Sequence, residues 1–281
     1  MSEPTSSDPQ ALVEQELVER IQAKPTNPFR QRDSEEAARE VEPQMQVYGP
    51  NAQCITDKSL GKAPPQDQSS DDRLRLVVEA SEGYIPLWAR GTTLRWRFRE
   101  RSLTLFEDPE GAKTAIQQLL GAAVLAWGDA APIKFAYVEG IPPDFEVGVR
   151  WASDCTISNG SRACVLASAF FPGTKREDPD QMWLYPTLFE QSPEEMVETL
   201  VHETGHCFGL RHYFAPESEP DIPSVVFGTH KPFSIMNYGR KSVMTEVDRS
   251  DLNLLYEAAW SGELREIDGT PIQLVKPSSA I

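Results

Sequence analysis

The stretch His202-Glu203-Thr204-Gly205-His206-Cys207-Phe208-Gly209-Leu210-Arg211-His212 has the spacing H-E-x-x-H-x-x-G-x-x-H. The whole chain contains four histidines, and three of them fall within this stretch. Histidines that are placed individually for core packing would not gather at such a regular spacing. The stretch therefore predicts a metal site, and the rest of the chain can be interpreted around it.

The spacing has a geometric reason. Residues four apart on an α-helix share a face and lie about 6 Å apart along its axis, so His202 and His206 can present their ring nitrogens to one ion. Glu203 follows His202, close enough to act on a metal-activated water without binding the metal. A continuing helix would carry a third ligand away. Gly209 can adopt the left-handed conformation that ends a helix, and the chain can then turn back and bring His212 to the ion.

This set of donors predicts zinc, with His202, His206 and His212 as ligands. Three imidazoles and an open fourth position are typical of catalytic zinc, whereas structural zinc sites have four protein ligands, often cysteines. Zinc bound in this way lowers the pKa of a water molecule to about 7 and polarises a carbonyl group. Glu203 is then the predicted general base, which takes a proton from the water and passes it to the leaving amine.

The motif resembles that of the metzincin clan of zinc endopeptidases. A second mark of that clan is a downstream turn containing methionine, which Ser234-Ile235-Met236-Asn237-Tyr238-Gly239 resembles. The resemblance implies that Met236 lies beneath the histidines without binding zinc. It also implies that Tyr238 can bind zinc and stabilise the oxyanion, as in astacins and serralysins. Tyr213, after the third histidine, fits no astacin, matrixin, reprolysin or serralysin signature, so the family within the clan stays open.

The resemblance implies a zinc-dependent endopeptidase that hydrolyses peptide bonds of proteins. The alternative is a non-proteolytic zinc-binding interaction module on a metzincin scaffold. The intact Glu203 argues against this alternative, because a protein that has lost its activity has no physical need for that carboxylate. Stoichiometric zinc in the purified protein would exclude a third possibility, that the motif arose by accident.

Composition narrows the range of partners. The 281 residues include 27 basic and 43 acidic side chains, which gives a net charge of −16. Nucleic acids and anionic membranes would repel such a chain, so we expect neither as a partner. No stretch approaches the roughly 20 apolar residues that a membrane span needs. We expect a protein or peptide substrate and a monomeric chain.

We divide the chain into three parts. Residues 1–80 are rich in proline and polar residues, so we expect poor order there. They are either a pro-segment that masks the zinc or a disordered extension. Cys54 could block the zinc as a thiolate, although its surroundings do not match the matrixin switch peptide. Residues 81–262 are predicted to form the peptidase domain, and residues 263–281 a C-terminal tail.

Hydrophobic periodicity indicates an α+β fold. Apolar residues recur at helical spacing from Pro109 to Trp127, and Pro193 begins a second helix that carries the motif, with Ser192 as its N-cap. The resemblance implies a twisted, mostly parallel five-stranded sheet with an antiparallel edge strand, two long helices and a small irregular C-terminal subdomain with a helix. The strands we expect are Leu74–Val78, Thr92–Phe98, Ile133–Val138, Phe145–Trp151 and Gln181–Tyr185.

A further segment resembles the edge strand that lies above the zinc in matrixins. An edge strand exposes unpaired backbone groups, to which an extended peptide can add itself. We expect this substrate-aligning strand to consist of Ala167, Ser168, Ala169, Phe170 and Phe171.

The cellular location is left open by conflicting signals. Cys155 and Cys164 flank a turn and could form a disulfide, and Asn159-Gly160-Ser161 is a glycosylation sequon. Together with the family resemblance they favour an extracellular protein. The first residues, however, lack the basic region and the apolar run of a signal peptide.

Overall fold

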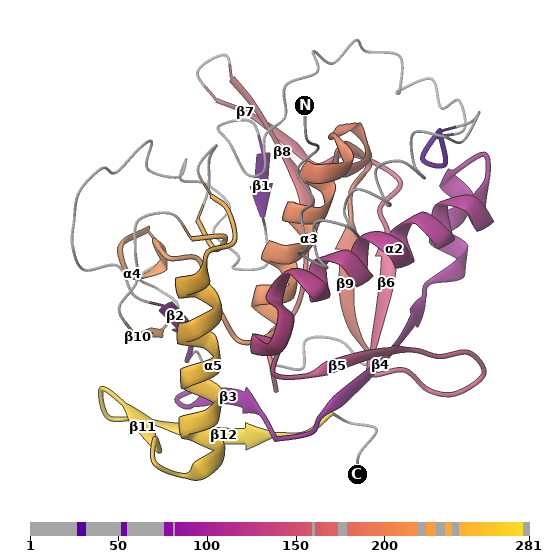
Figure 1. Ribbon diagram of the computed structural model, residues 1–281. Coiled ribbons are helices and arrows are strands. Elements are labelled where there is room, and N and C mark those ends of the chain that lie inside the picture. Colours follow the sequence, from indigo (N-terminus) through magenta and orange to yellow (C-terminus); the bar gives the residue numbers. More distant parts are fainter. Residues whose placement is uncertain are drawn as a thin grey trace, which may run out of the picture.

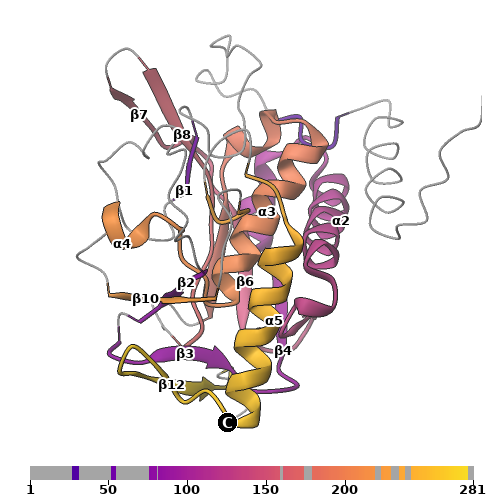
Figure 2. The ribbon, with the colours of Figure 1, turned by 60° about the vertical axis from the view of Figure 1, so that its left-hand side comes forward.

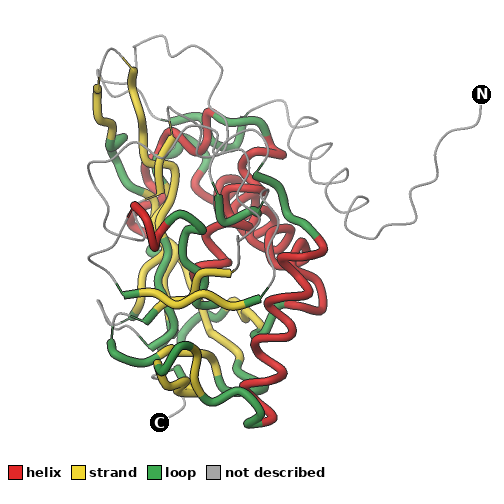
Figure 3. Tube along the Cα trace, turned by 90° about the vertical axis from the view of Figure 1, so that its left-hand side faces the viewer, coloured by secondary structure: helices red, strands yellow, loops and turns green. Residues whose placement is uncertain are grey.

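The computed structural model describes residues 27–31, 52–54, 76–80, 82–158, 161–173, 179–218, 223–228, 234–237 and 242–277. In these residues the chain forms an α+β fold, in which helices pack against one face of a large twisted sheet (Figures 1 and 3). This confirms the expected fold class. None of the described helices combines the length and the apolar composition needed to cross a membrane.

The main sheet contains seven strands and extends the predicted sheet of five. Neighbours run parallel except at the pairs β8–β9 and β7–β8, which are antiparallel. The mostly parallel arrangement is therefore confirmed, with two additional strands, β1 and β7. The order along the sheet is β1 (Ala52–Cys54), β8 (Ser161–Ser168), β9 (Asp180–Leu184), β6 (Phe145–Val149), β4 (Thr93–Phe98) and β5 (Lys134–Tyr137), with β7 (Cys155–Ser158) paired to β8.

Two long helices, α2 (Pro109–Trp127) and α3 (Pro193–Cys207), cover one face of this sheet (Figure 2). The bounds of α2 confirm the prediction. The Ser192 side chain caps α3 and forms the reciprocal capping box with Glu195, which fixes where this helix begins. The Trp127 ring nitrogen Nε1 donates to Thr204 Oγ1 at 3.0 Å, and this bond ties the end of α2 to the last turn of α3.

The remaining helices are shorter or lie in the C-terminal part of the chain. Helix α5 (Glu246–Ser261) starts at a second capping box, formed by Thr245 and Asp248, and ends at Gly262 in the left-handed conformation. It is the helix expected for the C-terminal subdomain. The others are α4 (Ala215–Ser218) and the 3-10 helices η1 (Glu100–Leu105), η2 (Gly128–Ala130) and η3 (Pro186–Glu190).

Two small sheets complete the described structure. Strand β2 (Leu76–Glu79) pairs antiparallel with β10 (Ser224–Phe227). The prediction of a strand near residues 74–78 is thus confirmed, although β2 does not join the main sheet. The second small sheet has the order β11 (Glu266–Ile267), β12 (Thr270–Val275) and β3 (Ile85–Trp88).

The C-terminal strands correct the prediction of a simple tail at residues 263–281. Strand β12 runs parallel to β3, with Ile272 opposite Ile85 and Val275 opposite Trp88. Its hydrogen-bonding partner comes from a distant part of the sequence, which a local pattern cannot reveal. Residues 266–275 therefore belong to the folded domain.

Parts of the N-terminal segment also correct the prediction for residues 1–80. Phe29 is 4% exposed, and its ring centroid lies 4.6 Å from that of Phe189 and 5.9 Å from that of Phe106. The Glu107 backbone nitrogen donates to the Arg30 carbonyl at 2.9 Å. Phe29 and Arg30 thus have partners in the domain, far from them in the sequence.

Candidate metal centre

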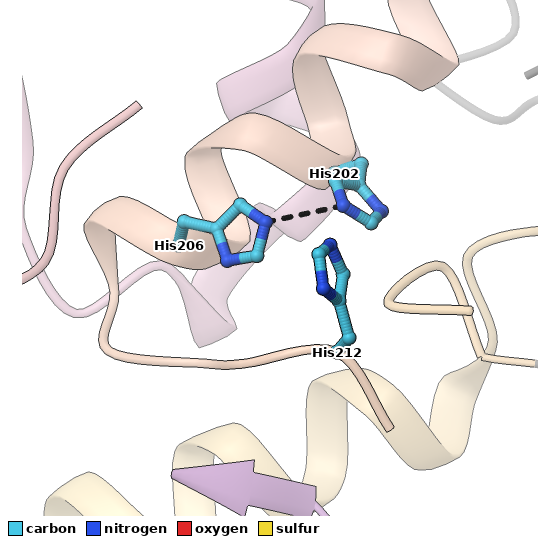
Figure 4. A group of neighbouring side chains, drawn as sticks. All are labelled: His202, His206 and His212. Atoms are coloured by element: carbon cyan, nitrogen blue, oxygen red, sulfur yellow. Dashed lines mark hydrogen bonds between the residues drawn. The ribbon is translucent and has the colours of Figure 1, made fainter. Parts of the chain in front are cut away.

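Three histidines converge at the end of α3. His202 and His206 lie one helical turn apart, and their Nε2 atoms are 3.1 Å from each other. His212 rises from the segment after the helix and faces both rings (Figure 4), with ring centroids 5.2 and 5.0 Å away. One ligand atom from each residue lies within 4.8 Å of the others, and all three side chains are buried. The structure thus brings the predicted ligands together.

The hydrogen bonds of the rings show that this site fits a metal ion. His202 Nδ1 lies 2.8 Å from the Ile235 carbonyl oxygen, and His206 Nδ1 lies 2.7 Å from that of Leu210. A carbonyl oxygen only accepts, so we infer that each Nδ1 carries the proton and each Nε2 is a bare acceptor. Two bare acceptors 3.1 Å apart repel each other unless a cation lies against both. Carbonyl partners at the outer nitrogen are also the usual surroundings of metal-binding histidines.

The turn after α3 has the geometry that brings His212 back. Gly209 has a φ of 91°, in the left-handed region. Its nitrogen donates to the His206 carbonyl at 2.8 Å, and the Leu210 nitrogen donates to the Gly205 carbonyl at 3.0 Å. This pair of bonds is the Schellman motif, which reverses the chain direction at a helix end.

Two side chains from outside the motif bind the last carbonyl groups of α3. The Trp88 ring nitrogen Nε1 donates to the Cys207 carbonyl at 2.7 Å, and the Tyr256 hydroxyl donates to the Phe208 carbonyl at 2.9 Å. Burial raises the pKa of Tyr256, so its hydroxyl remains a donor at physiological pH. These contacts connect β3 and α5 to the metal centre, and the sequence alone did not identify them.

The methionine turn lies directly against α3. A Cβ atom at Gly205 would overlap the Met236 sulfur, so glycine at this position allows the close approach. The Met236 nitrogen donates to Ser234 Oγ at 3.0 Å, and Ser234 Oγ donates to Asp248 Oδ1 at 2.6 Å. Asp248 is buried and holds the turn from α5. The spacing Thr245-x-x-Asp248 could have identified Asp248 as a cap, but nothing local marks Gly205.

The structure describes some of the other predicted site residues and leaves others outside the described ranges. Glu203 is buried on α3, adjacent to His202. Tyr238 and Asn159 lie outside the described residues. Cys54 is placed in β1, but its side chain is not described.

The predicted substrate-aligning strand requires a correction. Strand β8 ends at Ser168, so Ala169, Phe170 and Phe171 follow the strand instead of belonging to it. The Phe171 ring packs edge-on against His206, with centroids 5.4 Å apart. Strand β8 is also not an edge, because β1 pairs with it in parallel on the side opposite β9. Strand β1 lies opposite Cys164, Val165 and Ala167, so of the five residues expected to be open only Ala167 faces it.

The cysteines follow one of the expected arrangements. Cys155 and Cys164 form a disulfide across the β7–β8 hairpin. Cys207 is a free, buried thiol on α3, and burial raises its pKa well above the usual value. It therefore has little tendency to ionise and serve as a metal ligand.

Comparisons with known proteins agree with this site. Residues 87–220 match the peptidase family described as Matrixin. Mouse Stromelysin-3 is 23% identical over 193 residues, which cover 66% of this chain and 38% of the relative. Human Matrix metalloproteinase-17 is 26% identical over 195 residues, which cover 66% of this chain and 31% of the relative. The chain thus spans less than two fifths of the length of these relatives.

A solved structure of myroilysin is also similar. The match has 17% sequence identity and a TM-score of 0.44, and it covers 64% of this chain and 98% of the other. The assignment of the site rests on the sequence matches and on the three convergent histidines.

Proposed function

The chain belongs to the metzincin clan of zinc metallopeptidases, and from this premise we propose that it is a zinc-dependent endopeptidase that cleaves peptide bonds within proteins. One observation carries the proposal. Three buried histidines converge on one point, and the acidic residue Glu203 directly follows the first of them on α3. A purely structural zinc site needs a fourth protein ligand and no such neighbouring carboxylate.

The residues of the site have separate tasks in this proposal. His202, His206 and His212 hold the zinc, which when bound lowers the pKa of water and polarises the substrate carbonyl. Glu203 accepts the proton of the attacking water and delivers it to the leaving amine, which makes it base and then acid. Tyr238 donates a hydrogen bond to the developing oxyanion.

We also propose that substrate binds along β8. An extended peptide would add itself beside Ala167 and Ser168 and continue past Phe171, which contacts His206. Strand β1 pairs with this same side of β8, with Gln53 opposite Val165. A peptide can form these backbone bonds once β1 has left.

The part of residues 1–80 that precedes β2 is therefore proposed to act as an inhibitory pro-segment. The support is the position of β1, which lies opposite Cys164, Val165 and Ala167 and so overlaps the start of the proposed substrate path at Ala167. Phe29 adds a second point of attachment, packed against Phe106 and Phe189 away from β8. Two attachments on one segment raise its effective concentration at β8 compared with a free peptide.

An extracellular location is proposed on the basis of the disulfide. Cys155 and Cys164 are bonded in the structure, and such bonds persist in oxidising compartments. The hydrolytic site itself does not depend on this part of the proposal.

Replacement of Glu203 tests the reaction. We expect Glu203→Gln to retain zinc and to lose roughly 10²–10⁴-fold in hydrolysis of a mixed peptide library, which is the usual contribution of a general base. Glu194→Gln is the matched control, because Glu194 is exposed on the same helix. The assay uses residues 73–281, so that β1 is absent.

Two results would oppose the proposal. Unchanged turnover of Glu203→Gln would remove this residue from the mechanism. Full zinc occupancy without hydrolysis in any variant would favour a zinc-binding interaction module.

A further inference from the structure

A buried ion pair lies directly beside the third histidine. Arg211 Nε is 3.6 Å from Glu79 Oε2, and the two side chains are 0% and 2% exposed. Arg211 is the residue before His212, and Glu79 is the last residue of β2. Burial of an ion pair is not in itself stabilising, because the desolvation of both charges offsets their attraction. The presence of this pair beside the metal centre therefore calls for another explanation.

The backbone around the pair is bonded in the same place. The Arg211 nitrogen donates to the Val77 carbonyl at 2.8 Å, and the Glu79 nitrogen donates to the Gly209 carbonyl at 3.0 Å. Val78 and Leu210 form an antiparallel bridge between these two bonds. Strand β2 thus pairs with the segment that joins the helix-ending turn to the third ligand.

This segment also orients the second ligand. The Leu210 carbonyl lies 2.7 Å from His206 Nδ1, and the Leu210 nitrogen donates to the Gly205 carbonyl at 3.0 Å. A shift of Leu210 would turn the His206 ring and displace His212 together. Strand β2 lies before residue 87, where the match to the Matrixin family begins.

We propose that Glu79 and Arg211 are positioning residues of the metal centre. Their ion pair fixes the side chain of Arg211 against β2, and this contact holds His212 directly and His206 through the Leu210 carbonyl.

The inference rests on the metal site of the proposed function and not on hydrolysis. Its test therefore measures metal binding. A failure of the peptidase proposal and a failure of this proposal would then give different results. Zinc affinity is measured by competition with a chelator. Cobalt(II) serves as a second probe, because its visible absorption depends on the number and geometry of its ligands.

The variants are Glu79→Gln, Arg211→Met and the double substitution, all in the full chain. Each single substitution leaves one buried charge without its partner and can impair folding. The double substitution removes both charges, and such replacements of buried pairs often keep or increase stability. Glu257→Gln is the control, since Glu257 and Arg90 form an ion pair at 3.1 Å whose side chains are 47% and 69% exposed.

We expect the double variant to fold with unchanged or higher thermal stability in the absence of metal. Its zinc affinity should fall by roughly 10–100-fold, as for other groups that orient metal ligands, and its cobalt spectrum should change. Glu257→Gln should match the parent in both measurements. A folded double variant with the parent's zinc affinity and cobalt spectrum would overturn the proposal, because the pair would then be dispensable for the geometry of the site.

Discussion

Gly205 shows how tightly the residues around the histidines are packed. It lies on the buried side of α3, where the Met236 sulfur occupies the space that a side chain would fill. The sequence motif leaves this position open, since it specifies the histidines, Glu203 and Gly209 alone. The packing of Met236 thus requires glycine at position 205, which the spacing of the motif does not specify.

A pair of alanine substitutions tests this requirement. Gly205→Ala must displace Met236, and such overpacking costs about 1–3 kcal/mol, which outweighs the better helix propensity of alanine. Gly121→Ala lies in α2, where nothing is within 4 Å of the added Cβ, and should stabilise by about 0.5–1 kcal/mol. Denaturant unfolding measures both free energies. Equal effects of the two substitutions would contradict the packing of Met236 against α3.

The residues of the centre differ in how far sequence could predict them. His202, His206 and His212 could be placed because their spacing encodes one helical face and one turn, and the structure brings them together. The partners of these rings could not be predicted. The Ile235 and Leu210 carbonyls are backbone groups, which any residue type supplies equally well.

Among the elements, the β7–β8 hairpin carries the disulfide. Cys155 and Cys164 are separated by nine positions, and a loop of this length corresponds to about 2–3 kcal/mol of stability in the chain-entropy description. We expect the double substitution Cys155→Ser/Cys164→Ser to lower the free energy of unfolding by that amount. Zinc content should stay at the parent level, because the histidines lie on other elements. Loss of zinc with no change in the free energy of unfolding would contradict this separation of the disulfide from the metal centre.

The C-terminal strands provide a second test at this scale. The Ala89 nitrogen donates to the Val275 carbonyl at 2.8 Å, and β3 carries Trp88, whose ring binds the Cys207 carbonyl at 2.7 Å. A chain that ends at Gly262 should therefore unfold at a lower temperature and bind zinc more weakly. A chain that ends at Pro277 keeps both strands and should behave as the parent. Equal melting temperatures would show that β11 and β12 are dispensable.

Local elements were easier to predict than pairings between distant segments. Helix α2 could be placed at Pro109–Trp127 because its apolar periodicity and its N-terminal proline are contained in one segment. The pairing of β8 with β1 could not be predicted, because β1 comes from a proline-rich region with no strand pattern of its own. The pairing of β12 with β3 was missed for the same reason.

At the scale of the whole molecule, the N-terminal segment is attached to the domain at separate places. Phe29 packs against η3 and the residue that follows η1, β1 extends the main sheet, and β2 supports the metal centre. These pieces have different proposed roles. Removal of β1 should expose β8, whereas removal of β2 should disturb the histidines.

Two truncations separate these roles. A chain that starts at Arg73 should cleave peptides faster than the full chain, because β8 is open and β2 is kept. A chain that starts at Glu82, which lacks β2 and keeps β3 whole, should bind zinc more weakly than the one from Arg73. Peptide hydrolysis and zinc affinity are measured on each. Equal rates for the full chain and the chain from Arg73 would contradict the inhibitory pro-segment.

Substitutions within β1 refine this comparison. In the full chain, Ala52→Pro/Gln53→Pro removes two backbone donors and should weaken pairing with β8. We expect activity to rise towards that of the truncated chain. Ala52→Ser/Gln53→Ser keeps the donors and should remain as inhibited as the parent. A similar rise in both variants would point to side chains instead of backbone pairing.

The central claim, that His202, His206 and His212 hold a catalytic zinc, is tested most directly by titration of the metal-free chain from Arg73 with zinc. Peptide hydrolysis is recorded at each addition, with His212→Ala as the comparison. We predict that activity rises in proportion to zinc and levels off at one ion per chain, whereas His212→Ala stays inactive at the same zinc concentrations. Hydrolysis that is unchanged by removal of the metal, or a chain that takes up one zinc ion and still cleaves nothing, would contradict the account.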